Sequence, residues 1–202
     1  MNWLSKPLKK LPSLLINIRN SLNKDSFDSV NLYCQDESRV GLITKQKRVI
    51  TTKGVKPIGK YKHSYKYFWI WGSFSPITGD AHYMISDKVS KNAFIAYLND
   101  LAYHKPRELK LVIIDNAAFH STKNIKIPDN IILIPIPAYC PELNPAEKMW
   151  QWFKDRIAMK MFKSIETLED KITQLIKELE SQKIIQITAY EYLTKAYYSV
   201  FN

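Results

Sequence analysis

The chain has 202 residues, of which 46% are hydrophobic, and its formal net charge is +11. This length and composition predict one globular domain with a full core and exclude a disordered chain. Two cysteines without a CxxC pair, and four histidines without zinc-finger or HExxH spacing, exclude a disulfide scaffold and the common zinc sites. Such cysteine usage favours a reducing cytoplasm, and the lack of an apolar run of roughly 20 residues predicts no membrane partner.

Residues 1–28 predict an amphipathic helix or linker ahead of the main domain, which we place at residues 29–202. Pro12 should kink or shorten the helix. We expect it to lie on the domain body; a membrane-surface helix or a linker from a missing upstream domain are the alternatives. One apolar helix face is predicted by leucines and an isoleucine spaced by three and four residues: Leu4, Leu8, Leu11, Leu15, Ile18 and Leu22.

Several strands are predicted next. Residues 31–35 predict the first, and residues 41–43 and 48–52 predict a hairpin. Residues 67–74, rich in aromatic and β-branched side chains, predict a strand that returns after a turn as a further strand at 81–85.

Residues 45–66 hold eight basic residues and no acid. This concentration predicts contact with a polyanion, most directly nucleic acid, whereas a solvated surface is the alternative. Neutralising even six phosphates would make the affinity fall roughly 10³-fold between low and moderate salt. The eight residues are Lys45, Lys47, Arg48, Lys53, Lys56, Lys60, Lys62 and Lys66.

The second half predicts alternating strands and helices. Ser90 is the expected cap of a helix to about residue 104, and Asn144 with Pro145 is expected to begin another. The apolar run 109–114 predicts a strand covered on both faces, which belongs in a parallel region. Further predictions are a strand at 130–135, a long helix at 165–183 and a short helix at 189–198. The order predicts an α/β fold, a mixed sheet with helices on both faces.

Two acids are expected at strand ends. Asp36 is predicted to end the first strand and Asp115 the central one, so neighbouring strands would bring both carboxylates together beyond the sheet. Two close carboxylates repel each other unless a cation holds them, and Mg²⁺ prefers such oxygen ligands. A turn-forming role for Asp36 and an Asx turn at Asp115 are the alternatives.

Glu147 is the expected third ligand, from the first turn of the helix that follows. It also has the spacing of a capping box with Asn144, in which the glutamate would bond back to the cap backbone. Glu142 is a competing ligand. The residues alone leave these alternatives open.

Taken together, three segments carry a family resemblance: QDESR (residues 35–39), DNAAFH (115–120) and YCPELNPAEKMW (139–150). They resemble the catalytic domain of bacterial insertion-sequence transposases of the mariner-like superfamily, over roughly residues 30–180. The third segment is the most specific, because Pro-Glu-Leu-Asn-Pro followed by Glu and then Trp is rare by chance.

The resemblance implies a ribonuclease-H-like fold with an Asp-Asp-Glu triad of Asp36, Asp115 and Glu147, and it favours Glu147 over Glu142. It implies two Mg²⁺ or Mn²⁺ ions, bridged by Asp36 and each held by one of the other two acids, as phosphodiester transfer requires. The implied activity is DNA cleavage and strand transfer at the ends of an insertion sequence. Asn116 and His120 are expected supporting residues, with local turn bonding or ordinary packing as the alternatives.

Transposases of this type carry a helix-turn-helix region before the catalytic domain, and only about 30 residues precede Asn31. We therefore expect that recognition of the element ends comes from elsewhere. A separately encoded helix-turn-helix subunit, a frameshift fusion or a decayed element would each explain the short N-terminal region. A homodimer is a further expected partner, and the nucleoid is the expected location. The alternative functions are a catalytically idle DNA-binding remnant and a ribonuclease-H-like nuclease acting on RNA–DNA hybrids.

Overall fold

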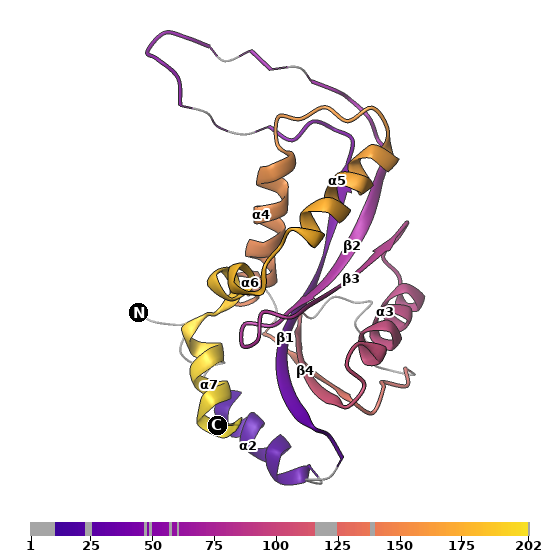
Figure 1. Cartoon of the computed structure of the whole chain (residues 1–202), viewed down its shortest axis with the longest axis vertical. Coiled ribbons are helices and arrows are strands. Elements are labelled where there is room, and N and C mark those ends of the chain that lie inside the picture. Colours follow the sequence, from indigo (N-terminus) through magenta and orange to yellow (C-terminus); the bar gives the residue numbers. More distant parts are fainter. Residues whose placement is uncertain are drawn as a thin grey trace.

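The computed structural model describes residues 11–22, 26–46, 48, 50–56, 58–59, 61–115, 125–137 and 140–201. Its centre is a five-stranded sheet in the order β3-β2-β1-β4-β5, with helices on both faces (Figure 1). The predicted mixed α/β architecture is therefore confirmed. Within the described ranges, no helix has the length and apolarity needed to cross a bilayer.

The sheet is antiparallel on one side of β1 and parallel on the other. β1 pairs antiparallel with β2, which pairs antiparallel with β3, whereas β1, β4 and β5 run parallel. All seven residues of β4 are buried, as predicted for a central strand covered on both faces. The bounds are Ser29–Gly41 for β1, Tyr67–Phe74 for β2, Ala81–Ser86 for β3, Glu108–Ile114 for β4 and Ile131–Pro135 for β5.

The helices divide between the two faces of the sheet. α3 covers one face, while α4, α5, α6 and α7 cover the other together with α2 (Figure 1). The predicted Ser90 cap is confirmed, because its side chain accepts a hydrogen bond from the Ala93 N–H at 3.1 Å. The bounds are Leu11–Ser21 for α2, Lys91–Tyr103 for α3, Ala146–Ile157 for α4, Ile165–Lys177 for α5, Ser181–Thr188 for α6 and Glu191–Phe201 for α7.

Alternate residues of β1 supply the two cores. Leu32 and Cys34 pack into the larger core, which the C-terminal helices share, whereas Tyr33 packs with Trp71 and Phe94 beneath α3. This alternation follows from the pleat of a strand. It also assigns each later residue of β1 to a face, including those of the candidate site.

The first strand is longer than predicted. β1 continues through Asp36 to Gly41, so Asp36 does not end the strand. The extension is stabilised by β2, which pairs with β1 from Cys34 to Gly41 after the pairing with β4 has stopped. A polar stretch such as Asp36–Ser38 gives no sequence signal for a strand, because its pairing partner lies more than 30 residues away.

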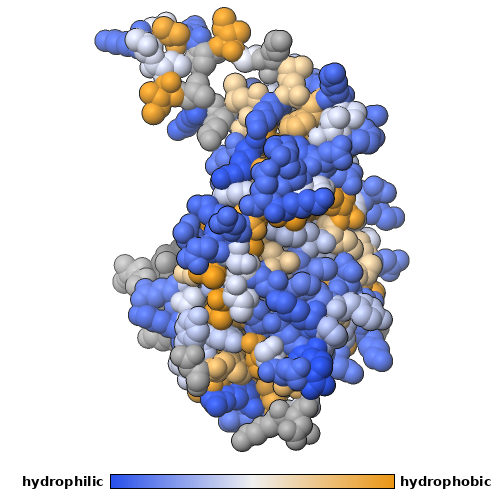
Figure 2. All heavy atoms as spheres, in the orientation of Figure 1, coloured by the Kyte–Doolittle hydropathy of each residue, from blue (hydrophilic) through white to orange (hydrophobic). Residues whose placement is uncertain are grey.

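The described residues between β1 and β2 (42–46, 48, 50–56, 58–59 and 61–66) form an arm that projects from the body (Figure 1). The predicted strand at residues 48–52 is wrong for the described residues 48 and 50–52, which have no strand structure. Ile50 and Ile58 are fully exposed, so the arm has no surface on which to bury a strand face. Figure 2 shows hydrophobic side chains among hydrophilic ones at this end of the molecule.

The long helix predicted at residues 165–183 is two helices. α5 ends at Lys177 and α6 begins at Ser181, with Leu179 between them packed against the larger core. The turn lets α6 bury Ile184 and Thr188, which a straight continuation of α5 would not place on that core. Helical periodicity alone did not show this break.

The N-terminal helix lies on the domain body, as expected. Leu11 and Leu15 of α2 are buried in the larger core, and α2 packs against α7. Pro12 occupies the first turn, where a missing N–H costs little. The predicted helical residues before Leu11 lie outside the described part of the chain, and the domain boundary at residue 28 stays a prediction.

Candidate active site

Asp36 and Asp115 come from neighbouring parallel strands. The last paired residues of β1 and β4 are Cys34 and Ile113, and each acid follows two residues further along its chain. Cys34 and Ile113 both pack into the larger core, so strand alternation directs Asp36 to the same face. The expectation that these two strands are neighbours is confirmed, and Asp115 lies directly beyond β4.

The carboxyl group of Asp36 is buried, with 8% of the residue exposed. Burial, together with the negative charges of Glu37, Glu147 and Asp115, raises its pKa to about 8, against a backbone hydrogen bond from Glu37 that lowers it. Glu147 and Asp115 therefore both lie within electrostatic reach of Asp36. The charges that act on Asp36 make its ionised form unfavourable without a cation.

Glu147 lies on the first turn of α4 and is exposed. Its side chain makes no hydrogen bond or ion pair with any other described residue, so the capping box with Asn144 does not form there. Asn144 instead accepts a hydrogen bond from the Ala146 N–H at 3.2 Å. Glu142, the competing ligand, is exposed on the short 3-10 helix Pro141–Leu143 and is not among the charges that raise the pKa of Asp36.

The chemistry of these donors fits a hard divalent cation, because Mg²⁺ and Mn²⁺ take carboxylate oxygens. A cation beside Asp36 would offset the repulsion that raises its pKa. Among the described residues, however, no three acidic, histidine or cysteine side chains converge tightly enough to hold an ion.

A groove of about 750 Å³ is lined by Glu147, one of the three predicted acids. It lies along the part of β1 that follows its pairing with β4, where α4 and the base of the arm form the other walls. The guanidinium of Arg39 lies 5.1 Å from the ring centre of Tyr67. The lining combines two acids, four cations and four aromatic rings: Glu37 and Glu147; Arg39, Lys45, Lys66 and Lys154; Tyr65, Tyr67, Trp69 and Trp150.

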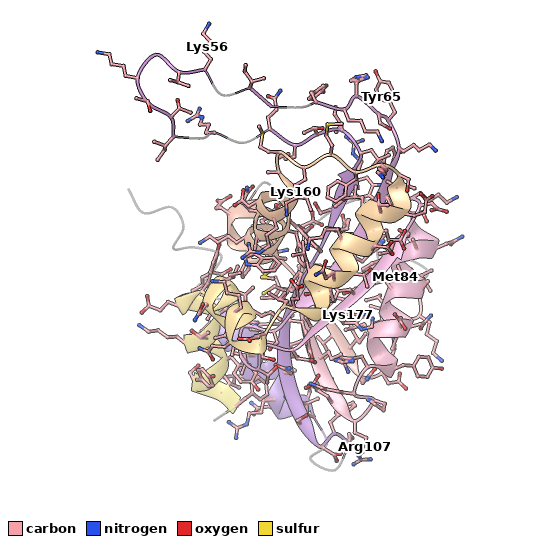
Figure 3. The ribbon with its side chains drawn as sticks, turned by 45° about the horizontal axis from the view of Figure 1, so that its top comes forward. Lys56, Tyr65, Met84, Arg107, Lys160 and Lys177 are labelled. Atoms are coloured by element: carbon pink, nitrogen blue, oxygen red, sulfur yellow. The ribbon has the colours of Figure 1, made fainter. Side chains whose placement is uncertain are left out.

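The predicted basic residues do not all have the same surroundings. Lys62 donates hydrogen bonds to the carbonyls of Phe162 and Lys163, at 2.8 and 2.7 Å, and so ties the arm to the segment after α4. Lys45 and Lys66 line the groove, while Lys56 lies at the outer end of the arm (Figure 3). Arg48 and Lys53 are exposed residues of the arm. Lys47, Lys60, Asn116 and His120 lie outside the described residues.

Two residues that touch this site were predicted only as packing or cap residues. Trp150 donates a hydrogen bond from Nε1 to Asp36 Oδ2 at 2.9 Å, and Asn144 donates from Nδ2 to the Gln35 carbonyl at 2.8 Å. Helical periodicity gives Trp150 only a core role. The available signal was chemical, because a buried indole N–H needs an acceptor.

Comparison with known proteins decides the family. The sequence profile of the DDE superfamily endonucleases matches residues 31–169, which is more than half of the chain. The chain belongs to the DDE superfamily endonuclease family. The predicted catalytic domain of this type is thereby confirmed, and the matched residues contain all three predicted acids.

One curated relative shares a shorter stretch. The uncharacterised protein y4pE/y4sA of Sinorhizobium fredii is 39% identical over 59 residues, which are 29% of this chain and 44% of the relative. Its name assigns no activity.

The fold matches solved transposase structures. The Mos1 transposase paired-end complex with left transposon end has a TM-score of 0.66 and 14% identity, covering 100% of this chain and 64% of that chain. The Mos1 strand transfer complex has a TM-score of 0.64 and 14% identity, with 97% and 61% covered. This chain therefore spans less than two thirds of the proteins it matches. At this identity the likeness shows the fold, and the predicted ribonuclease-H-like fold is confirmed.

Proposed function

We propose that this chain is the catalytic domain of a transposase that cleaves DNA at the ends of a mobile element and transfers a strand. The observation that supports the proposal is that the charges of Glu147, on the first turn of α4, and Asp115, after β4, both act on the buried carboxyl group of Asp36 on β1. The Mos1 structures solved with Mn and with Mg support the choice of a divalent cation.

In this proposal the three carboxylates would hold Mg²⁺ or Mn²⁺ at the edge of the sheet. When bound, the metal would lower the pKa of the attacking water or 3′-hydroxyl and neutralise the leaving oxygen. The buried Asp36 would be one ligand, and Asp115 and the exposed Glu147 would be the others. Arg39, Lys45, Lys66 and Lys154 in the adjoining groove would pair with the phosphates on either side of the cleaved bond.

The arm extends this basic surface. Its outer cations, Arg48, Lys53 and Lys56, would contact DNA away from the cleavage point, and Lys47 and Lys60 belong to the same proposed set. Lys62 would act indirectly, because its ammonium group already donates to two carbonyls. A second copy of the chain, in a homodimer, remains a proposed partner. A separately encoded helix-turn-helix subunit is the other, and it would provide sequence-specific recognition of DNA.

The proposal is tested by nicking of a labelled DNA duplex with Mg²⁺ or Mn²⁺. We expect cleavage by the parent chain and none by Asp115→Asn, with DNA binding unchanged or stronger because one negative charge is gone. A folded parent that binds DNA but never nicks it would favour the idle remnant. Cleavage of an RNA–DNA hybrid in preference to DNA would favour the ribonuclease-H-like nuclease.

A further inference from the structure

Two buried hydrogen bonds join α4 and the segment just before it to β1, and their acceptors belong to the adjacent residues Gln35 and Asp36. Asn144, just before the helix, donates to the backbone carbonyl of Gln35 at 2.8 Å. Trp150, one turn into the helix, donates to the side chain of Asp36 at 2.9 Å. The helix that carries Glu147 is therefore fastened to the strand that carries Asp36, at Asp36 itself.

The indole of Trp150 is held rigidly in the place from which it reaches Asp36. The residue is 2% exposed, and its ring meets Phe74 edge to face with centres 5.3 Å apart. Because carboxylate acceptors make the stronger hydrogen bonds, the Trp150 N–H fixes Asp36 Oδ2 and with it the plane of the carboxylate.

Gly72 provides the space for this contact. It is the cross-strand partner of Asp36 on β2, and a Cβ there would lie 2.7 Å from Trp150 Cη2 and 2.7 Å from Phe74 Cζ. Both distances are far below van der Waals contact. The missing side chain at Gly72 thus lets the indole lie across β2 and reach the carboxylate opposite.

Asn144 links the backbone of β1 to the first turn of α4. Its Oδ1 accepts from the Ala146 N–H at 3.2 Å while its Nδ2 holds the Gln35 carbonyl. The start of α4 is therefore fixed relative to the residue that precedes Asp36. Glu147 follows one residue after Ala146, so its position relative to Asp36 is set by the same contacts.

We propose that Trp150 is a positioning residue: through the space left at Gly72, its indole N–H orients the Asp36 carboxylate for a divalent cation. This inference rests on the proposed function, because it concerns the same metal site. Removal of a donor that holds a metal-binding side chain typically weakens metal affinity by about 10–100-fold.

The test is Mn²⁺ binding by calorimetry without DNA, for the parent and Trp150→Phe. Phenylalanine keeps an aromatic ring in the core and removes the N–H donor. We expect the dissociation constant of Mn²⁺ to rise about 10-fold, with a change in the free energy of unfolding no larger than that of the control variant. Unchanged Mn²⁺ affinity in Trp150→Phe would overturn the proposal.

Trp152→Phe is the matched control on the same helix. Trp152 Nε1 is buried but has no hydrogen-bond partner among the described residues, so this substitution breaks no such bond. We expect this variant to bind Mn²⁺ as the parent does. If both substitutions weakened Mn²⁺ binding equally, both rings would act by packing alone. That result would refute the role of the Trp150 N–H.

Gly72→Ala gives an independent test, because its methyl group would push the indole away while leaving every donor and acceptor in the chain. We expect weaker Mn²⁺ binding in this variant as well; parent-like binding would contradict the role given to Gly72. A parent chain that binds no Mn²⁺ would instead remove the proposed function, and the positioning role with it.

Discussion

At the residue scale, Asp36 is the unusual group of the site. A carboxyl group that is buried near three other acids gains nothing by ionising, and its pKa of about 8 reflects both burial and repulsion. Its hydrogen bond from Trp150 favours the ionised form without overcoming those effects. When ionised, such a residue lowers the stability of the metal-free fold. A bound cation would remove the repulsion between the carboxylates.

This residue makes the stability of the metal-free protein depend on pH. The folded state binds the Asp36 proton more tightly than the unfolded chain, whose pKa is near 3.8. The resulting stabilisation is complete below pH 4 and is lost as the pH rises through 8. We expect Asp36→Asn to be more stable than the parent at pH 8, on the order of 2–5 kcal/mol, with a smaller difference at pH 5.

Urea denaturation in EDTA at pH 5, 6.5 and 8 measures this difference. Glu142→Gln is the control, because that side chain is exposed and is not among the charges that mainly shift the pKa of Asp36. A difference between Asp36→Asn and the parent that stayed constant across this range would show that Asp36 ionises normally in the fold.

The same two glutamates separate the alternatives for the third acid. Glu147→Gln removes a charge that acts on Asp36, whereas Glu142→Gln does not. We expect Glu147→Gln to lower the rate of metal-dependent nicking at least 100-fold, an order of magnitude typical for the loss of a charged catalytic group, while Glu142→Gln stays near the parent rate. The reverse result would assign the role to Glu142.

At the scale of elements, the turn between β2 and β3 is fixed against α6. Gly79 has φ of +70°, and a Cβ there would lie 2.2 Å from the Ser181 carbonyl oxygen. The turn is closed by hydrogen bonds between Ser75 and Asp80 and between Gly79 and Ser75, at 2.8 and 3.1 Å. Contact between this turn and the first residue of α6 helps to explain why α5 and α6 are separate helices.

Substitution of Gly79 should therefore destabilise the fold by more than the strain of its left-handed backbone angle alone. We expect Gly79→Ala to lower the free energy of unfolding by about 2–4 kcal/mol, from the left-handed angle and the overlap together. Gly54→Ala is the matched control, since Gly54 has φ of +85° and, its chain neighbours aside, none of the described residues comes within 4 Å of the position that its methyl group would take. That variant should lose about 1 kcal/mol, and equal losses in chemical denaturation would argue against the contact with α6.

At the scale of the whole molecule, positive charge and exposed apolar side chains are displaced onto the arm. Residues 45–66 carry eight basic residues and no acid, while the body is close to neutral. The arm is anchored at its base by backbone hydrogen bonds, from Leu42 to Lys66 at 3.0 Å and from Thr44 to Lys62 at 3.1 Å, and by Lys62. The arm therefore holds Lys45 and Lys66 at the groove and Lys56 at its outer end.

This arrangement predicts that DNA affinity depends on salt through the arm. We expect the double variant Lys53→Ala/Lys56→Ala to bind DNA more weakly and to reduce the slope of log K against log salt by about 1.8, near 0.9 for each phosphate that is no longer neutralised. Lys177→Ala/Lys183→Ala removes the same charge from α5 and α6 and should leave the slope unchanged. Equal slopes for the two double variants, measured by fluorescence anisotropy, would exclude the arm from the DNA interface.

Much of the fold follows from local sequence patterns. The apolar run of β4, the Ser90 cap of α3 and the core face of α4 were predicted because each depends on neighbours within one element. The extension of β1 beyond Gln35 and the break between α5 and α6 were not, because each depends on a partner distant in the chain. The strand predicted at residues 48–52 failed for the same reason, since the arm has no partner sheet.

The sequence by itself determined the residue types of the site and the family, because carboxylates beside an apolar strand and the PELNPAE segment are local features. The tertiary structure decided how Asp36 is held. Its burial, the glycine opposite and the indole that contacts it come from β1, β2 and α4. The hydrogen bond between Asp36 and Trp150 joins residues 114 positions apart, so it is set by packing and no local pattern encodes it.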